Sequence, residues 1–268
     1  MTRGNTTGDH PWHIAVVGDN TIDRYVDSSI VGGNALNVAA QLTLAGHTAG
    51  YWGAVGTDPL ADVIRMAMNR IGLSTRGVVT MSGSTAVTDI AVLPDGERVF
   101  EREEFGVTAE FFPSERHLDA IAECQWIHIG MQPRASDLRS AIRARNPRAV
   151  ISQDMSVSSG FDDLDVAFTS GAMLQGIEPR EAIRRHLSAG VTTSIVTLGS
   201  QGVIGSDGDD FSFLPAKHID VVDATGAGDS FIAGFIAAMT QGATLPEALE
   251  SGTRLAATTC GHRGGWRQ

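Results

Sequence analysis

The chain contains little lysine and little cysteine. Lys217 is the only lysine among 268 residues, and the two cysteines, Cys124 and Cys260, lie far apart. A phosphate loop of the Gly-Lys-Ser/Thr type needs a lysine after a glycine, so this class of nucleotide site is excluded. Two distant cysteines without Cys-x-x-Cys spacing indicate neither a disulfide framework nor a zinc site. This usage fits a reducing compartment, and we expect a cytoplasmic protein.

The sequence also lacks an excess of positive charge and any long apolar run. Lysine and arginine together number 20 against 31 acidic residues, which gives a net charge of -11. Such a chain has no surplus of cations to displace counterions from a nucleic-acid backbone. The longest apolar run, residues 231–239, falls well short of the roughly 20 residues that a membrane helix needs. We therefore expect small-molecule partners, and neither nucleic acid nor a membrane.

What the sequence does have is an alternation of short apolar runs and amphipathic segments. Residues 13–18 form an apolar run that ends in glycine, which is typical of a strand buried on both faces of a parallel sheet. Further strands are predicted at 51–56, 125–130, 149–152, 165–169 and 193–198, and helices at 34–42, 60–71, 114–123, 135–145, 179–188, 232–239 and 245–259. The pattern predicts a single α/β domain over residues 1–268, with a doubly wound, mostly parallel sheet flanked by helices.

Two predicted hairpins interrupt this alternation. Residues 86–102 alternate with a period near two on both sides of a turn at 94–96, and residues 203–213 form a second candidate. A half-exposed hairpin inserted over one end of a parallel sheet is suited to act as a lid. We therefore expect a small β-hairpin lid, with elements at about 23–32 and 84–103.

A glycine-rich turn with two carboxylates, Asp223 and Asp229, precedes the apolar helix at 232–239. Residues 221–222 before it are interpreted as the end of an element. A turn of this kind leaves the first N–H groups of the helix unpaired and favours an anion. Phe231 stands where the dinucleotide fingerprint needs a third glycine, which disfavours a Rossmann dehydrogenase. Asp229 could accept a hydroxyl proton during phosphoryl transfer, or it could simply be an acid that the helix dipole favours.

Polar residues also follow the first predicted strand. Asp19 and Asp23 come directly after it, and Asn34 and Asn37 lie in the first turn of the next helix. Ligands of open α/β sheets collect beyond the carboxyl ends of strands, so these carboxylates could hold a polyhydroxylated ligand; equally, they could cap turns. His128, by contrast, lies inside an apolar strand and is predicted to be a core residue.

Three motifs in this order resemble those of the ribokinase-like carbohydrate kinases, the PfkB family. They are the diglycine segment at 32–37, the glycine turn at 197–202 and the Asp-Ala-Thr-Gly-Ala-Gly-Asp-Ser-Phe segment at 223–231. The resemblance covers nearly the whole chain. Within the family the chain is most similar to the fructoselysine 6-kinases, on residues 18–23, 32–35, 228–235 and 264–266.

The resemblance implies an ATP-dependent kinase that transfers the γ-phosphoryl group to a sugar hydroxyl, in the first place the 6-hydroxyl of fructoselysine or a related fructosamine. It implies that Asp229 is the catalytic base and that Gly226, Ala227 and Gly228 form the anion hole. The implied substrate-binding residues are Asp23, Gly33 and Asn37, with Asn34 and Asp19 as further candidates. The implied nucleotide-binding residues are Thr197, Gly199, Gly202, Gly226, Gly228 and Gly261.

The same resemblance implies ATP with Mg²⁺ as the cofactor pair, with the metal held mainly by phosphates and water. Asp223, Thr225 and Gly264 resemble a monovalent-cation loop, which implies K⁺. Many relatives carry an Asn-x-x-Glu segment that organises the magnesium waters, whereas residues 170–173 here contain no acid, so protein ligands for Mg²⁺ are unassigned.

A second departure from the family lies in the lid. The segment 23–32 is too short for the extended lid strands of ribokinases, which leaves residues 86–102 as most of the lid and leaves a homodimer through the lid as an open prediction. Two other interpretations also stay open. One is a kinase of the same fold acting on fructose, ribose, a sugar phosphate or a nucleoside. The other is a ligand sensor that keeps the fold without catalysis.

Overall fold

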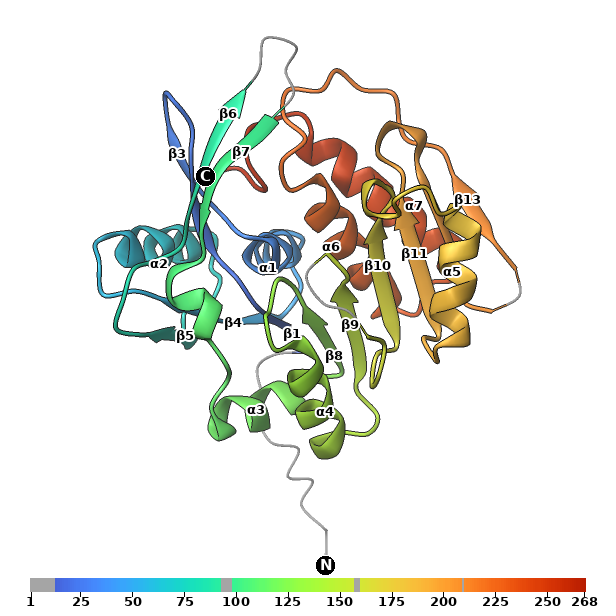
Figure 1. The fold of residues 1–268 in the computed structure, drawn as a ribbon, viewed down its shortest axis with the longest axis horizontal. Helices are drawn as coiled ribbons and strands as arrows, with labels where there is room; N and C mark the ends of the chain where they lie inside the picture. The colour runs from blue at the N-terminus through green and yellow to red at the C-terminus, as the bar shows by residue number, and fades with distance from the viewer. Residues whose placement is uncertain (1–12, 93–97, 157–159, 209) are drawn as a thin grey trace, which may run out of the picture.

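The computed structural model describes residues 13–92, 98–156, 160–208 and 210–268 (Figure 1). Its main sheet has nine strands in the order β13-β12-β11-β10-β9-β8-β1-β4-β5. These strands are β1 (Ile14–Val17), β4 (Ala49–Val55), β5 (Gly77–Thr80), β8 (Trp126–Ile129), β9 (Val150–Asp154), β10 (Val166–Ser170), β11 (Thr193–Thr197), β12 (Val203–Ser206) and β13 (Ser212–Leu214). The strands from β11 to β5 are parallel, and β12 and β13 form the predicted second hairpin.

The predicted doubly wound α/β fold is confirmed. The chain runs outward from β1 through β4 to β5, then returns to the other side of β1 and continues through β8, β9, β10 and β11. The direction of winding therefore switches between β1 and β8, which is where open α/β sheets bind ligands. The helices are α1 (Asn34–Leu44), α2 (Leu60–Arg70), α3 (Glu115–Ala122), α4 (Ala135–Arg145), α5 (Pro179–Ser188), α6 (Ala227–Met239) and α7 (Leu245–Thr259).

Strand β1 shows why the sheet carries helices on both faces. Ile14 and Val16 point into a core that includes residues of α1, α2, α6 and α7, whereas Ala15 and Val17 point into a core shared with α3 and α4. All four side chains are fully buried. Burial of a large apolar side chain stabilises the fold by about 1.5–3 kcal/mol relative to exposure, so an apolar run without alternation is stable only between two helix layers.

His128 of β8 is a core residue, as predicted. Its side chain is fully buried, its Nδ1 lies 3.0 Å from the Oγ of Ser152, and burial lowers its pKa to about 3. The imidazole is therefore neutral and forms part of the packing between β8 and β9.

Helix α6 is fixed to the sheet by aromatic packing close to its first turn. Phe231 and Phe235 place their ring centroids 6.4 and 5.2 Å from that of Phe168 on β10, in edge-on arrangements. Such pairs contribute about 0.5–1.5 kcal/mol beyond their buried area. Because Phe231 follows Asp229 by two residues, this packing sets where the start of α6 lies.

A smaller sheet of four strands lies at the top of Figure 1. The strands β9, β10 and β11 of the main sheet point with their carboxyl ends toward this side. Its order is β3-β2-β6-β7, from β2 (Thr21–Arg24), β3 (Ser29–Gly32), β6 (Val87–Val92) and β7 (Arg98–Glu104). Both segments that were expected in the lid belong to this sheet: residues 86–102 supply β6 and most of β7, and the 23–32 segment supplies most of a β2–β3 hairpin that pairs with β6. The predicted turn at 94–96 lies outside the described residues.

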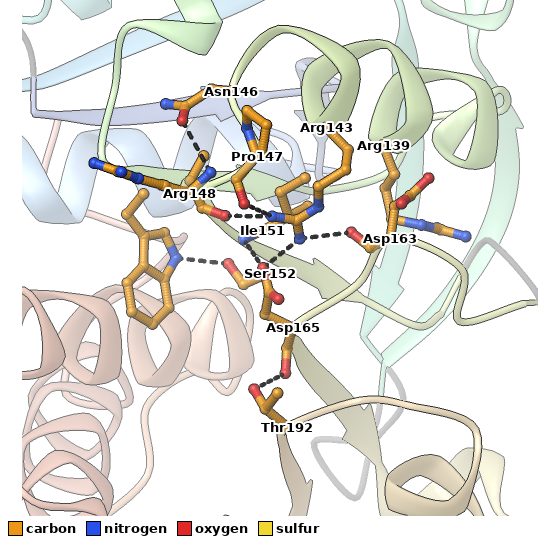
Figure 2. A network of polar contacts seen from close by, with 12 residues as sticks. Arg139, Arg143, Asn146, Pro147, Arg148, Ile151, Ser152, Asp163, Asp165 and Thr192 are labelled. Carbon is orange, nitrogen blue, oxygen red and sulfur yellow. Dashed lines mark hydrogen bonds and ion pairs between the residues drawn. The ribbon is translucent and has the colours of Figure 1, made fainter.

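Arg143 of α4 joins the amino ends of β9 and β10 (Figure 2). Its guanidinium donates to the carboxylate of Asp165 at 2.7 Å and to the carbonyl of Ala149 at 2.9 Å. The same Asp165 oxygen accepts the backbone N–H of Ile151 at 2.7 Å. We call Arg143, Asp165 and their backbone partners the arginine network. It pairs a half-buried acid with a cation at the edge of the sheet opposite the small sheet.

Residues 221–222, just before α6, were predicted to end a secondary-structure element, and the structure differs. Residues 215–226 contain no strand, and Val221 and Val222 are 62% and 64% exposed. Hydrogen bonds from the N–H groups of Val222 and Asp223 to the carbonyl of Cys260 hold this segment instead. Across the described residues, no helix combines the length and apolarity needed to span a bilayer.

Candidate active site

Helix α6 begins at a glycine that no other residue could replace without strain. Gly226 has φ 71°, and a Cβ there would lie 2.4 Å from the Cα of Gly265. The N–H of Ala227 donates to the carbonyl of Ala224, but no described residue accepts the N–H of Gly228 or of Asp229. Gly228 is also exposed, with open space around it. The start of α6 therefore presents unpaired donors to an anion.

Two asparagine side chains hold the carboxylate of Asp229. The Nδ2 of Asn34 donates to its Oδ1, and the Nδ2 of Asn37 donates to its Oδ2, each at 2.7 Å. Both asparagines lie in the first turn of α1, one helical turn apart on the same face. The base that the sequence predicts is thus fixed from a helix almost 200 residues away in the chain.

Asp229 is partly open to solvent, yet protein encloses its carboxylate deeply enough to disfavour the charge. This desolvation raises the pKa of Asp229 well above its ordinary value, and the neighbouring Asp154 and Asp19 raise it further. The hydrogen bonds from Asn37 and Asn34 act in the opposite direction. A carboxylate with a raised pKa is a stronger proton acceptor once it is ionised.

Asp19 holds the amino end of α1. Its Oδ2 accepts the N–H of Asn34 at 2.8 Å and its Oδ1 accepts the N–H of Ala35 at 2.9 Å. These bonds replace an ordinary N-cap, because the capping position is occupied by Gly33 with φ 108°. Burial raises the pKa of Asp19 to about 6 despite these bonds. Asp19 therefore places the two asparagines that hold Asp229.

All five sequence-predicted substrate residues line one pocket of about 300 Å³, which we call the central pocket. Of the predicted site residues, it brings together Asp19, Asp23, Gly33, Asn34, Asn37, Thr225, Gly226 and Asp229. Its other lining residues include Thr88, Glu103 and Glu104 of the small sheet, and Ala86, Phe105 and Met131. The pocket lies between the carboxyl end of β1, the start of α6 and the small sheet, near the switch in winding.

Of the predicted nucleotide residues, Gly226 lines the central pocket and Gly228 follows it in α6, whereas the other four lie outside the lining. Thr197 is the last residue of β11, and Gly199 and Gly202 form the tight turn that follows. Gly202 meets a packing need in that turn, because a Cβ there would lie 2.1 Å from the carbonyl oxygen of Leu214. Gly261 follows the end of α7. These residues lie beyond the carboxyl end of β11 or after α7, apart from the substrate residues.

The predicted cation loop is closed by Asp223. This buried carboxylate accepts the N–H of Thr225 through Oδ1 at 2.5 Å and the N–H of Gly264 through Oδ2 at 3.0 Å. The chain after α7 is also bound to α1, because the Nε2 of Gln41 donates to the carbonyl of Gly265 at 2.6 Å. The structure therefore places Asp223, Thr225 and Gly264 together, next to Gly226.

Asp154 is a site residue that the sequence did not reveal. It is the last residue of β9, and its Oδ2 accepts a hydrogen bond of 2.8 Å from the Nδ2 of Asn34. The only local signal is an acid two residues beyond the predicted end of an apolar strand. Its relation to Asn34, 120 residues earlier, depends on the tertiary structure.

We call Asp19, Asp154 and Asp229 the acid cluster. None of the three forms an ion pair with another residue in the described part of the chain. Three carboxylates around one asparagine, beside unpaired helix N–H groups, can accept a proton from a hydroxyl while an anion is bound next to them.

Comparisons with known proteins agree with this geometry. The profile of the pfkB family carbohydrate kinases matches residues 21–151 and 167–266. Fructoselysine 6-kinase of Shigella flexneri is 33% identical over 259 residues, which cover 94% of this chain and 99% of that protein.

Solved structures share the fold at lower identity. Arabidopsis thaliana ribokinase, in complex with ribose and ATP, superposes with a TM-score of 0.85 at 20% identity and covers 94% of this chain and 93% of its own. An Escherichia coli ribokinase-like chain in complex with ATP and Mg²⁺ gives a TM-score of 0.81 at 19% identity, with 95% and 94% covered. The chain therefore belongs to the pfkB family of carbohydrate kinases and is a phosphotransferase.

Proposed function

We propose that this kinase transfers the γ-phosphoryl group of ATP to the 6-hydroxyl of fructoselysine or a related fructosamine, with Asp229 as the base. One observation carries the proposal. The carboxylate of Asp229 is held by Asn34 and Asn37 at the wall of the central pocket, directly beside the open N–H groups at the start of α6. A proton acceptor next to an anion site is the pair of groups that phosphoryl transfer to an alcohol needs.

The reaction assigns a role to each part of the site. Asp229 accepts the proton of the acceptor hydroxyl as the hydroxyl oxygen forms its bond to the γ-phosphorus. The bond between the γ-phosphorus and the bridging oxygen breaks, and that oxygen leaves with ADP. The open N–H of Gly228, with the backbone of Gly226 and Ala227 around it, stabilises the negative charge on the transferred group. Asp23, Gly33 and Asn37 orient the sugar in the central pocket.

The charge of the pocket supports a fructosamine as the acceptor. Five of its described lining residues are acids, namely Asp19, Asp23, Glu103, Glu104 and Asp229, and none of the described lining residues is a lysine, arginine or histidine. A fructosamine carries a protonated secondary amine next to its sugar, and a positive charge is attracted to such a lining. A sugar phosphate would be repelled. The 33% sequence identity to fructoselysine 6-kinase of Shigella flexneri, over 94% of this chain, supports the same acceptor.

Mg²⁺ would enter with the nucleotide. In the described part of the chain, no group of three histidine, cysteine or acidic residues is placed to hold a metal ion. Phosphate oxygens and water commonly hold Mg²⁺, and the ion would neutralise phosphate charge during transfer. Thr197, Gly199, Gly202 and Gly261 are proposed to bind the nucleotide around it.

Three further assignments belong to the same proposal. Asp223, Thr225 and Gly264 are proposed as a K⁺ site, because Asp223 joins the other two. The small sheet is proposed as the lid of one domain, because β2, β6 and β7 supply pocket residues. A cytoplasmic location fits a kinase that uses ATP and whose two cysteines lie far apart in the sequence. Turnover with K⁺ replaced by Na⁺ tests the first of these.

The test of the acceptor is a coupled assay of ADP release with fructoselysine, fructose, ribose, a hexose phosphate and a nucleoside. We expect the highest kcat/KM with fructoselysine, and mass spectrometry should find the phosphate on the 6-oxygen. Turnover with another member of the panel alone would replace the acceptor and keep the kinase. Binding of nucleotide and sugar without release of ADP for any of them would indicate a sensor and overturn the proposal.

A further inference from the structure

The amide group of Asn34 connects two carboxylates. Its single nitrogen donates one N–H to Asp229 at 2.7 Å and the other to Asp154 at 2.8 Å, so both of its hydrogens are used. Its oxygen is buried without a hydrogen-bond partner among the described residues and faces Gly130, where a Cβ would lie 2.6 Å away. Reversing the amide would place that oxygen against two carboxylates, so the orientation is fixed by charge.

Asp154 does not line the central pocket. Its Oδ1 accepts the N–H of Ser156 at 3.0 Å, and its Oδ2 accepts the bond from Asn34. It therefore has no direct path to an acceptor or to the anion site. Any effect of Asp154 on the reaction passes through Asn34 or through its own negative charge.

The surroundings of Asp229 make that charge effective. Asp154 faces it from the end of β9 and Asp19 from the end of β1, while Asp23 of β2 and Glu103 and Glu104 of β7 lie across the pocket. Among these acids, Glu104 pairs with Arg102 on the exposed face of β7. At Asp229 itself, the amides of Asn34 and Asn37 donate hydrogen bonds that oppose the repulsion among the acids.

We propose that Asp154 is a positioning residue for the kinase reaction: through the amide of Asn34 it fixes the orientation of the Asp229 carboxylate, and its negative charge keeps that carboxylate basic. The proposal rests on the role of Asp229 as the base. It also makes Asn34 a residue that holds the base rather than one that binds the substrate, because both of its side-chain N–H groups already donate to carboxylates.

Asp154→Asn tests the charge with little change of shape. Loss of the negative charge stabilises ionised Asp229, so the acid limb of kcat against pH should move to lower pH by roughly one unit. A weaker base also gives a lower plateau, and we expect kcat to fall about tenfold while KM for the acceptor stays within about twofold. The matched control is Asp62→Asn on the exposed face of α2, for which we expect no change.

Asp154→Ala removes both the charge and the hydrogen bond to Asn34, so kcat should fall further, by about a hundredfold. If this variant does not fold, Asp154→Asn and a direct titration still decide. In protein labelled with ¹³C at aspartate carboxyl carbons, the Asp229 resonance should titrate at lower pH in Asp154→Asn than in the native chain.

The outcomes separate this inference from the proposed function. Near-normal turnover of Asp229→Asn would overturn the base itself. If Asp229→Asn is inactive while folded Asp154→Asn keeps the native pH profile and the native Asp229 titration, the base stands and the role of Asp154 is wrong. A rise in KM without a change of kcat or pH profile would make Asp154 a residue of substrate binding and would likewise overturn the inference.

Discussion

Strand β9 joins two acidic sites of opposite design. At its amino end, Asp165 is paired with Arg143 and accepts the N–H of Ile151, so its charge is balanced and stabilises the sheet (Figure 2). At its carboxyl end, Asp154 meets Asp229 and Asp19 with only asparagine amides between them. The acid that serves the fold is neutralised, whereas burial without a cation raises the pKa values of Asp19 and Asp229, as in catalytic sites.

The largest expected effect comes from the unbalanced end. Asp229→Asn removes the base while keeping its shape, and we expect kcat to fall by about 10²–10⁴-fold, the usual contribution of a general base. The melting temperature at pH 8 should not fall, because repulsion from Asp154 and Asp19 is relieved. Coupled ADP release and thermal unfolding measure the two effects, and Asp62→Asn is the control. A large loss of stability instead would show that the acid cluster serves the fold.

The balanced end should respond in the opposite way. Arg143→Ala leaves Asp165 without its cation, and we expect a loss of about 2 kcal/mol in the free energy of unfolding, below the 3–5 of a fully buried pair because both side chains are about one quarter exposed. kcat of the folded enzyme should stay unchanged. Urea unfolding gives the first value and saturating turnover the second.

Arg148→Ala is the matched control for Arg143→Ala, because Arg148 is an exposed arginine in the same region. We expect the free energy of unfolding of Arg148→Ala to lie within about 0.5 kcal/mol of that of the native chain. Equal losses for the two variants would mean that the ion pair with Asp165 contributes nothing specific.

The pH dependence of stability tests Asp19. Its pKa is raised from 3.8 to about 6 in the folded chain, so the folded state binds the proton more tightly. Stability from this group is therefore full below pH 4 and is lost as the pH rises to about 6, by up to about 3 kcal/mol. Asp19→Asn cannot titrate, so its stability relative to the native chain should increase over this range. A constant difference between pH 4 and pH 6.5 would contradict the raised pKa.

The smallest effect is expected at the exposed pair between the segment after α7 and the small sheet. Arg263 donates to both carboxylate oxygens of Asp27 at 3.0 and 2.9 Å, but both side chains are more than half exposed. Gln41 and Gln268 also hold this segment. Arg263→Ala should change the unfolding midpoint less than Arg143→Ala, and added salt should shrink the change. A loss as large as that of Arg143→Ala would make this pair part of the fold's stability.

The sequence predicted the main sheet well because its signals are local. Short apolar runs ending in glycine and helices with one apolar face each show their period within a few residues, as in 13–18 and in α4. Strand β5 carries no such signal: it is a four-residue edge strand that pairs only with β4. The segment at 23–32 was predicted as a lid element without its two strands for the same reason, since β2 and β3 are four residues each and β2 pairs with the distant β6.

The site divides in the same way between local and distant information. Gly226 and Asp229 could be recognised because a glycine turn before an apolar helix has a known electrostatic consequence. Asp154 could not, because nothing near it in the chain indicates that Asn34 lies 2.8 Å away. The raised pKa of Asp229 likewise depends on tertiary structure, because the carboxyl ends of β1 and β9 bring Asp19 and Asp154 close to the start of α6.

The measurement that tests the central claim most directly is the titration of the Asp229 carboxyl by ¹³C NMR in the native protein, compared with the pH dependence of kcat for fructoselysine. If the acid cluster makes Asp229 the base, its midpoint lies well above the ordinary 3.8 and kcat rises with the ionisation of the same group. A midpoint near 3.8, or a raised midpoint that kcat does not follow, would contradict the account.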